Sequence, residues 1–92
     1  MRKTISKKDL EKYRLITEKA FSIVKENISP NKKDEAKKII EMVGCYLSDS
    51  KHFEKQEDYV NAFGAIYYAH GWIDCGVRLK IFNVTDDKLF TI

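Results

Sequence analysis

The sequence has 92 residues, of which 43% are hydrophobic and 34% are charged, and its formal net charge is +3. This composition excludes an intrinsically disordered chain, and the length excludes more than one sizeable hydrophobic core, so we expect a single domain spanning residues 1–92. Most of the positive charge lies in the first 41 residues, which hold 12 Lys or Arg against 7 Asp or Glu.

The sequence contains no segment that predicts a membrane span or a secretory signal. No run reaches the roughly 18 apolar residues that a transmembrane helix needs, and the basic start is not followed by an apolar stretch with a cleavage site. We therefore expect a cytoplasmic protein. Cys45 and Cys75 both lie among apolar residues, which predicts buried, reduced thiols rather than a disulfide.

A first helix is predicted over about residues 7–27. Ser6 precedes it as a cap, and Leu10, Tyr13 and Ile16 begin a series of apolar residues that recurs every three or four positions. We expect this helix to end before Pro30, because proline disfavours helical angles at the residue that precedes it.

A second helix is predicted over about residues 31–54. Asp34 and Glu35 lie in its first turn, where the helix dipole favours negative charge. Its apolar residues keep helical spacing from Ala36 to Phe53.

The third predicted helix, over about residues 58–80, is apolar on more than one face, so we expect neighbours on most of its sides. Glycine is unfavourable inside a helix unless another backbone approaches closely, and Gly64, Gly71 and Gly76 therefore predict tight packing against the other two helices. The aromatic residues exceed what so short a chain can bury. Tyr68 and Trp72 are therefore assigned to a candidate interaction surface.

Short links near residues 28–31 and 55–58 make neighbouring helices antiparallel and predict an all-α, up-down-up three-helix bundle. We expect the short C-terminal tail to pack on this bundle, because exposed apolar residues at a terminus are unfavourable. In the alternative, Leu89 and Phe90 of the tail belong to the interaction surface and contact a partner.

Polar residues inside the third helix form the other candidate site. His70, Asp74 and Arg78 recur every four residues and share a face, with Tyr67 one turn before His70. In one reading, Asp74 orients His70 beside Arg78 for proton transfer or anion binding. In the other, the residues form a structural polar ladder of hydrogen bonds and ion pairs along the third helix, with Arg78 reaching Glu35. We favour the structural reading, because buried polar groups need partners and this spacing supplies them.

The motifs of common enzymes are absent, since the sequence has no phosphate-binding glycine loop, nucleophile elbow, CxxC or HExxH. The histidines and cysteines lie at different levels of the predicted bundle, so they do not provide the four ligands of a structural zinc site. We expect a non-catalytic domain with no catalytic residue, metal or cofactor.

The segment EDYVNAFGAIYYAHGWIDCGVRLKIF and the closing LFTI resemble an archaeal family of proteins of unknown function, number 357, whose members share the AHGW-[LI]-D block. The resemblance covers essentially the whole chain and implies a short three-helix bundle, but no activity. Cys75 stands where the family favours alanine, and Lys80 where it commonly has glycine. A looser similarity to HEPN domains does not extend to their ribonuclease pattern, because Arg78 follows His70 instead of preceding it.

Two hypotheses for the function follow. In the first, the domain is a protein-interaction or self-association module, and its partner is a second copy or another helical protein. In the second, the basic N-terminal half binds nucleic acid or nucleotides, with an affinity that falls steeply with salt. One contiguous basic patch would favour nucleic acid, whereas scattered lysines would indicate an ordinary solvated surface. The basic residues concerned are Lys7, Lys8, Lys12, Arg14, Lys19, Lys32, Lys33, Lys37 and Lys38.

Overall fold

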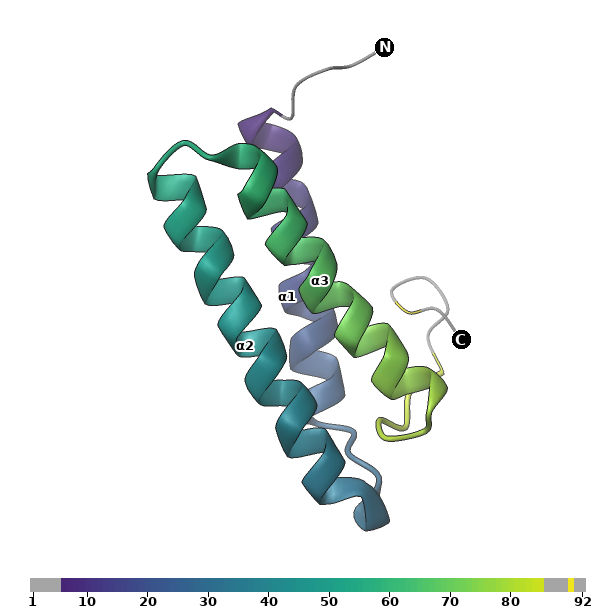
Figure 1. Cartoon of the computed structure of the whole chain (residues 1–92). Coiled ribbons are helices and arrows are strands. Elements are labelled where there is room, and N and C mark those ends of the chain that lie inside the picture. The colour runs from purple at the N-terminus through teal and green to yellow at the C-terminus, as the bar shows by residue number, and fades with distance from the viewer. Residues whose placement is uncertain (1–5, 86–89, 91–92) are drawn as a thin grey trace.

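The computed structural model describes residues 6–85 and residue 90, and it is an all-α, up-down-up bundle of three helices (Figure 1). α1 spans Lys7–Lys25, α2 spans Lys33–Lys55 and α3 spans Tyr59–Arg78, and the short 3-10 helix η1, Pro30–Lys32, lies between α1 and α2. The predicted fold class and the order of the helices are confirmed. The observed helix ends differ from the predicted ones by no more than two residues.

Side-chain caps begin two of the helices. The hydroxyl of Ser6 accepts a hydrogen bond from the backbone N–H of Asp9 at 3.1 Å, and the carboxylate of Asp58 accepts one from the N–H of Asn61 at 3.2 Å. These bonds satisfy N–H groups that have no partner within the first turn of a helix. α2 has no such cap and continues directly from η1, whose first residue is Pro30.

α2 and α3 end in the same kind of turn. Glu57 and Lys80, which follow the two helices, have positive φ angles of 59° and 62°. After α3, the N–H of Lys80 donates to the carbonyl of Val77 at 3.1 Å, and the N–H of Ile81 donates to that of Gly76 at 2.9 Å. This pair of bonds is the Schellman motif, in which one residue adopts the left-handed backbone conformation, and glycine does so without strain. The positive φ of Lys80 therefore gives a physical reason why glycine would suit this position.

α3 lies between the other two helices. It packs mainly on α2 and less extensively on α1, whereas α1 and α2 meet at few positions. Aliphatic residues from all three helices form the core, and Leu10, Val43 and Ile73 have no exposed surface. The bundle measures 42 × 23 × 17 Å. The expectation that α3 has neighbours on most sides is wrong for the described residues, because exposed positions recur along the outward side of this helix.

The chain after α3 folds back onto the link between α1 and α2. The N–H of Ser29 donates to the carbonyl of Ile81 at 3.0 Å, and the N–H of Asn83 donates to that of Asn27 at 2.7 Å. These bonds flank an isolated antiparallel bridge that Phe82 forms with the link. The tail therefore closes the end of the bundle where α3 finishes.

Phe82 and Phe90 anchor the tail in the core, with 1% and 4% of their surface exposed. The predicted packing of the tail is confirmed for these residues. The alternative that placed Phe90 on the interaction surface is wrong, because its ring is buried among core residues of the same chain. Leu89, the other tail residue assigned to that surface, lies outside the described residues. Within residues 6–85 and residue 90, none of the helices has the length and apolar character that a membrane span requires.

Candidate functional site

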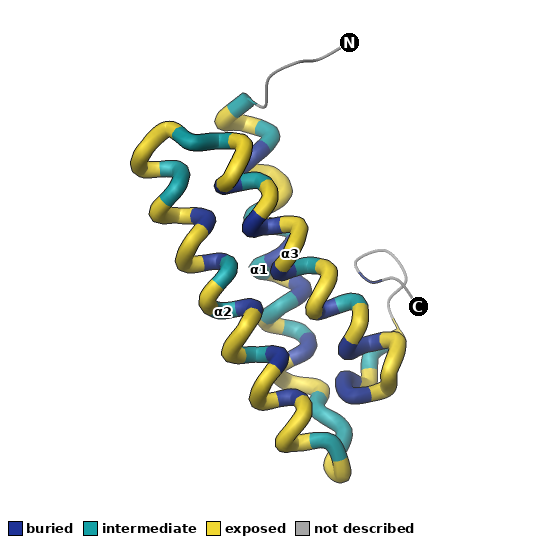
Figure 2. Tube along the Cα trace, in the orientation of Figure 1, coloured by how far each residue is buried: buried dark blue, intermediate teal, exposed yellow. Residues whose placement is uncertain are grey.

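The outward side of α3 carries a stripe of apolar and small residues, and Figure 2 shows exposed positions recurring along the helix. We define the α3 face as the exposed apolar and small residues on this side, which are Val60, Gly64, Tyr67, Tyr68, Gly71, Trp72, Cys75 and Leu79. At 100° per residue they fall within about 140° of the helix circumference. From Tyr59 to Ile73 the helix has no Lys, Arg, Asp or Glu, so most of this stripe has no charged side chain within it.

The large side chains of the α3 face are not covered by the residues that the structure describes. Tyr68 is 65% exposed, Leu79 is 61% exposed, Tyr67 is 57% exposed and Trp72 is 38% exposed. Single exposed apolar residues are common on soluble proteins, whereas large contiguous sets of them are not. Tyr68 and Trp72, which the sequence assigns to a candidate interaction surface, are both exposed.

Two shallow grooves meet at Gly71. One has a volume of about 480 Å³ and is bounded by Tyr67, Tyr68, Trp72 and Cys75. The other, of about 330 Å³, lies between α1 and α3 and shares Tyr67 and Gly71 with the first. Because Gly71 has no side chain, the helix backbone is accessible between Tyr68 and Trp72.

Contacts with other aromatic residues orient the tyrosines of the α3 face. Tyr68 stacks on Tyr46 of α2, with ring centroids 5.4 Å apart and an angle of 20° between the planes. Tyr67 lies against Phe63 and against Tyr13 of α1, with centroid distances of 4.9 Å and 6.0 Å. Rings held in this way lose less conformational freedom when a partner binds, which favours a preformed contact surface.

The glycines of α3 have two different environments. A Cβ atom at Gly76 would lie 2.5 Å from Cε2 of Phe82 and 3.2 Å from Cδ1 of Ile39. At Gly64 and at Gly71 it would meet nothing within 4 Å. The predicted close packing is therefore confirmed at Gly76 and wrong at Gly64 and Gly71, which both lie on the α3 face.

The polar residues of α3 lie beside α1. The hydroxyl of Thr17 is 3.0 Å from Nδ1 of His70, and Nε2 of His70 is 3.7 Å from Oδ1 of Asp74. Thr17 is only 2% exposed. Both imidazole nitrogens thus face side chains of the same domain, and the contact with Thr17 links α1 to α3, a partner that the sequence did not predict.

The structure therefore brings together two of the four predicted ladder residues. Tyr67 contacts aromatic rings, and Arg78 lies exposed at the end of α3. In the part of the chain that the structure describes, no three His, Cys, Asp or Glu side chains group as ligands for a metal ion.

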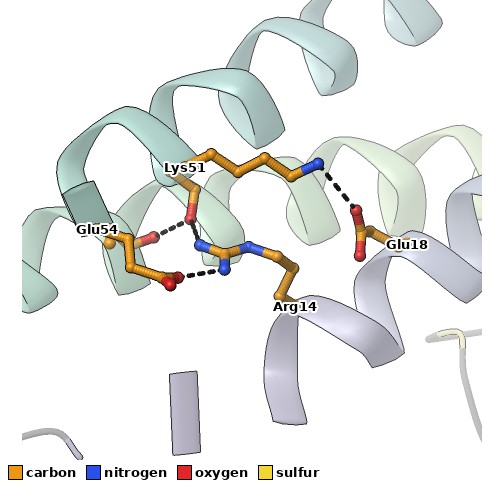
Figure 3. Close-up of polar contacts among 6 residues, drawn as sticks. Arg14, Glu18, Lys51 and Glu54 are labelled. Carbon is orange, nitrogen blue, oxygen red and sulfur yellow. Dashed lines mark hydrogen bonds and ion pairs between the residues drawn. The ribbon is translucent and has the colours of Figure 1, made fainter. Parts of the chain in front are cut away.

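A second polar group, which the sequence reasoning missed, joins all three helices (Figure 3). Arg14 of α1 pairs with Glu54 of α2, and its Nη2 donates to the hydroxyl of Ser50 at 2.9 Å. The Ser50 hydroxyl in turn donates to the carbonyl of Ala62 in α3 at 2.9 Å. Ser50 has no exposed surface, so these bonds satisfy polar atoms in the interior of the bundle.

The spacing of these residues contains a signal that could have identified them. Arg14 and Thr17 follow the buried Leu10 by four and seven positions, and therefore continue its stripe on α1. Ser50 follows the buried Leu47 by three positions on α2. A polar residue on a buried helical stripe predicts a partner on a neighbouring helix.

The basic residues of the N-terminal half extend along the length of the bundle. Lys7 and Lys8 begin α1, Lys12 and Lys19 follow along it, and Lys33 lies at the start of α2. Because the two helices are antiparallel, the starts of α1 and α2 lie toward opposite ends of a bundle whose longest dimension is 42 Å (Figure 1). Arg14 is engaged with Glu54. The distribution is closer to scattered charges than to one contiguous patch.

The prediction of buried thiols is wrong. Cys45 and Cys75 are both exposed and are not joined by a disulfide. Apolar neighbours in the sequence did not indicate burial, because each cysteine lies on the outward side of its helix. Cys75 is part of the α3 face.

Comparison with known proteins identifies a family without a known activity. No curated protein and no solved structure matches the chain. One family model matches residues 12–82, and it is described as Protein of unknown function (DUF357). The matched segment runs from α1 to Phe82 and contains the whole α3 face. The chain therefore belongs to the DUF357 family, as its AHGWID block predicts.

Proposed function

We propose that the domain is a non-catalytic protein-interaction module whose contact surface is the α3 face. The observation that carries this proposal is the row of exposed, uncharged residues along α3, with Tyr68 and Trp72 beside an open groove. Aromatic enrichment and depletion of charge are typical of the centre of a protein interface. Binding of nucleic acid by the basic residues is less well supported, because those residues do not gather in one patch.

Affinity capture from an extract of the native cells tests the proposal with three full-length baits: the natural chain, Tyr68→Glu and Leu15→Glu. Leu15 is a matched control, because it is 67% exposed and lies on α1 outside the α3 face. We expect the natural chain and Leu15→Glu to retain the same proteins. Tyr68→Glu should retain about tenfold less of them, because a carboxylate is unfavourable in an apolar contact.

Circular dichroism of each bait shows whether it is folded. A parallel capture after nuclease treatment separates direct protein interaction from binding through nucleic acid. Equal retention by the three folded baits would contradict the proposal. Loss of every retained protein after nuclease treatment would also contradict it and would support nucleic-acid binding instead.

A further inference from the structure

Among the residues that the structure describes, no neighbour explains why positions 64 and 71 are glycine. Glycine is less favourable in a helix interior than alanine by roughly 1 kcal/mol. A Cβ at either position would meet nothing within 4 Å, so no contact inside the domain requires glycine there. The two residues are seven positions apart and therefore lie on the same side of α3, two turns from each other. Close approach of another backbone across the α3 face would account for both.

The α3 face is complementary to itself when two copies of the helix run antiparallel. Such helices, related by a two-fold axis, pair positions whose residue numbers have a constant sum. Residues 68 and 71 add to 139, as do 64 and 75, and this sum pairs every member of the α3 face with another member. The residues that share a level are Gly71 with Tyr68, Gly64 with Cys75, Tyr67 with Trp72, and Val60 with Leu79, and the first two of these pairs lie nearest the centre of the face.

This register matches the shape of the surface as well as its chemistry. Tyr68 of one copy enters the groove over Gly71 of the other, and the symmetry repeats the contact on the far side of the axis. A large ring thus lies opposite a residue without a side chain, which allows close packing of helices. Tyr46 and Tyr13, which contact Tyr68 and Tyr67, widen the surface onto α2 and α1.

Charges at the ends of α3 select the antiparallel direction. Glu57 and Asp58 precede the helix, Arg78 is its last residue and Lys80 follows it. Antiparallel pairing places the acidic start of one α3 beside the basic end of the other, and it also opposes the two helix dipoles. Parallel pairing would place like charges and like dipole ends together.

From these observations we propose that the partner of the α3 face is a second copy of this chain, bound as an antiparallel, two-fold symmetric α3 pair in which Gly71 faces Tyr68. The inference rests on the proposed function, since it names the occupant of the same surface.

Cysteine cross-linking of the full-length chain tests the register. Cys45→Ala leaves Cys75 as the only native thiol, and adding Gly64→Cys places a new thiol opposite Cys75 of the second copy. Under mild oxidation we expect at least tenfold more covalent dimer from this variant than from the chain that keeps Cys75 alone. The two Cys75 residues of such a pair are eleven positions out of register, about 16 Å along the axis, which is too far for a disulfide.

The matched control carries Gly44→Cys in place of Gly64→Cys. Gly44 lies on α2 outside the α3 face, and a Cβ there also meets nothing within 4 Å, so this variant reports random collisions between folded chains. Equal cross-linking of the two variants would overturn the inference. Stronger cross-linking through Cys75 alone would overturn it as well, since that result indicates parallel pairing.

The failure of this inference is distinguishable from the failure of the proposed function. If the Gly64→Cys chain does not cross-link above the control, while Tyr68→Glu still loses a captured protein of a different sequence, the second copy is the wrong occupant and the proposed function remains supported.

Discussion

The ring of Phe82 packs against the backbone of Gly76 near the end of α3. Phe82 is buried and closes the core, and its ring occupies the space where a Cβ of residue 76 would lie. Gly44, on α2, differs, because a Cβ added at this position would meet nothing within 4 Å. The same residue type therefore has opposite effects on stability at the two positions.

Gly76→Ala is expected to lower the free energy of unfolding by about 1–3 kcal/mol, because the new methyl group overpacks against Phe82. Gly44→Ala is expected to raise it by up to about 1 kcal/mol, because alanine favours the helix and meets no neighbour. Denaturant unfolding followed by circular dichroism measures both changes. Stabilisation by Gly76→Ala would show that the contact with Phe82 is not close in solution.

Local sequence could not separate Gly76 from Gly71 or predict the exposure of Cys75. α3 is apolar on several sides, so the usual periodicity did not indicate which side faces the bundle. The distinction depends on where α1, α2 and the tail lie around α3, which is a property of the fold. The exposure of Tyr68 and Trp72 could be predicted, because a short chain cannot bury all of its large aromatic side chains.

At the scale of the helices, the polar group around Arg14 supplies much of the connection between α1 and α2. These two helices have few other contacts, because α3 lies between them. The side chains of Arg14 and Glu54 are 11% and 22% exposed. A second ion pair between the same helices, Lys51 with Glu18 at 3.6 Å, is more open, with side chains that are 60% and 37% exposed (Figure 3).

Double-mutant cycles should separate the two ion pairs. Alanine substitutions of Arg14 and Glu54, alone and together, are expected to give a coupling free energy of about 1.5–3 kcal/mol, because charged hydrogen bonds contribute more when shielded from water. The same cycle for Lys51 and Glu18 should give less than about 1 kcal/mol. Equal coupling in both cycles would contradict the role of Arg14 as the main link between α1 and α2.

The helices could be predicted from the sequence, but their rotation could not. The caps at Ser6 and Asp58 and the spacing of apolar residues are local features, and the predicted ends agree with the structure within two residues. On α1 the predicted inward stripe included Tyr13, which is 38% exposed, and omitted Thr17, which is 2% exposed. Contacts such as that of Thr17 with His70 depend on this rotation, which the partners of a helix determine.

At the scale of the whole molecule, three helices leave one side of α3 open. The tail covers the end of the bundle through Phe82 and Phe90, but among the described residues the α3 face, from Val60 to Leu79, remains exposed. A second copy would cover this side, and two open glycines, a self-matching register and complementary charges at the helix ends support that assembly. Pairing of two copies through the α3 face is the central claim about this protein.

Sedimentation equilibrium of three full-length chains at about 100 μM, well above a micromolar Kd, tests this claim most directly. The natural chain should have twice the 10.8 kDa mass of one chain, and so should the matched control Gly44→Glu. Gly71→Glu should have the mass of a single chain, because it places a carboxylate at the centre of the apolar contact. A measured mass of 10.8 kDa for the natural chain at this concentration, or a doubled mass for Gly71→Glu, would contradict pairing through the α3 face.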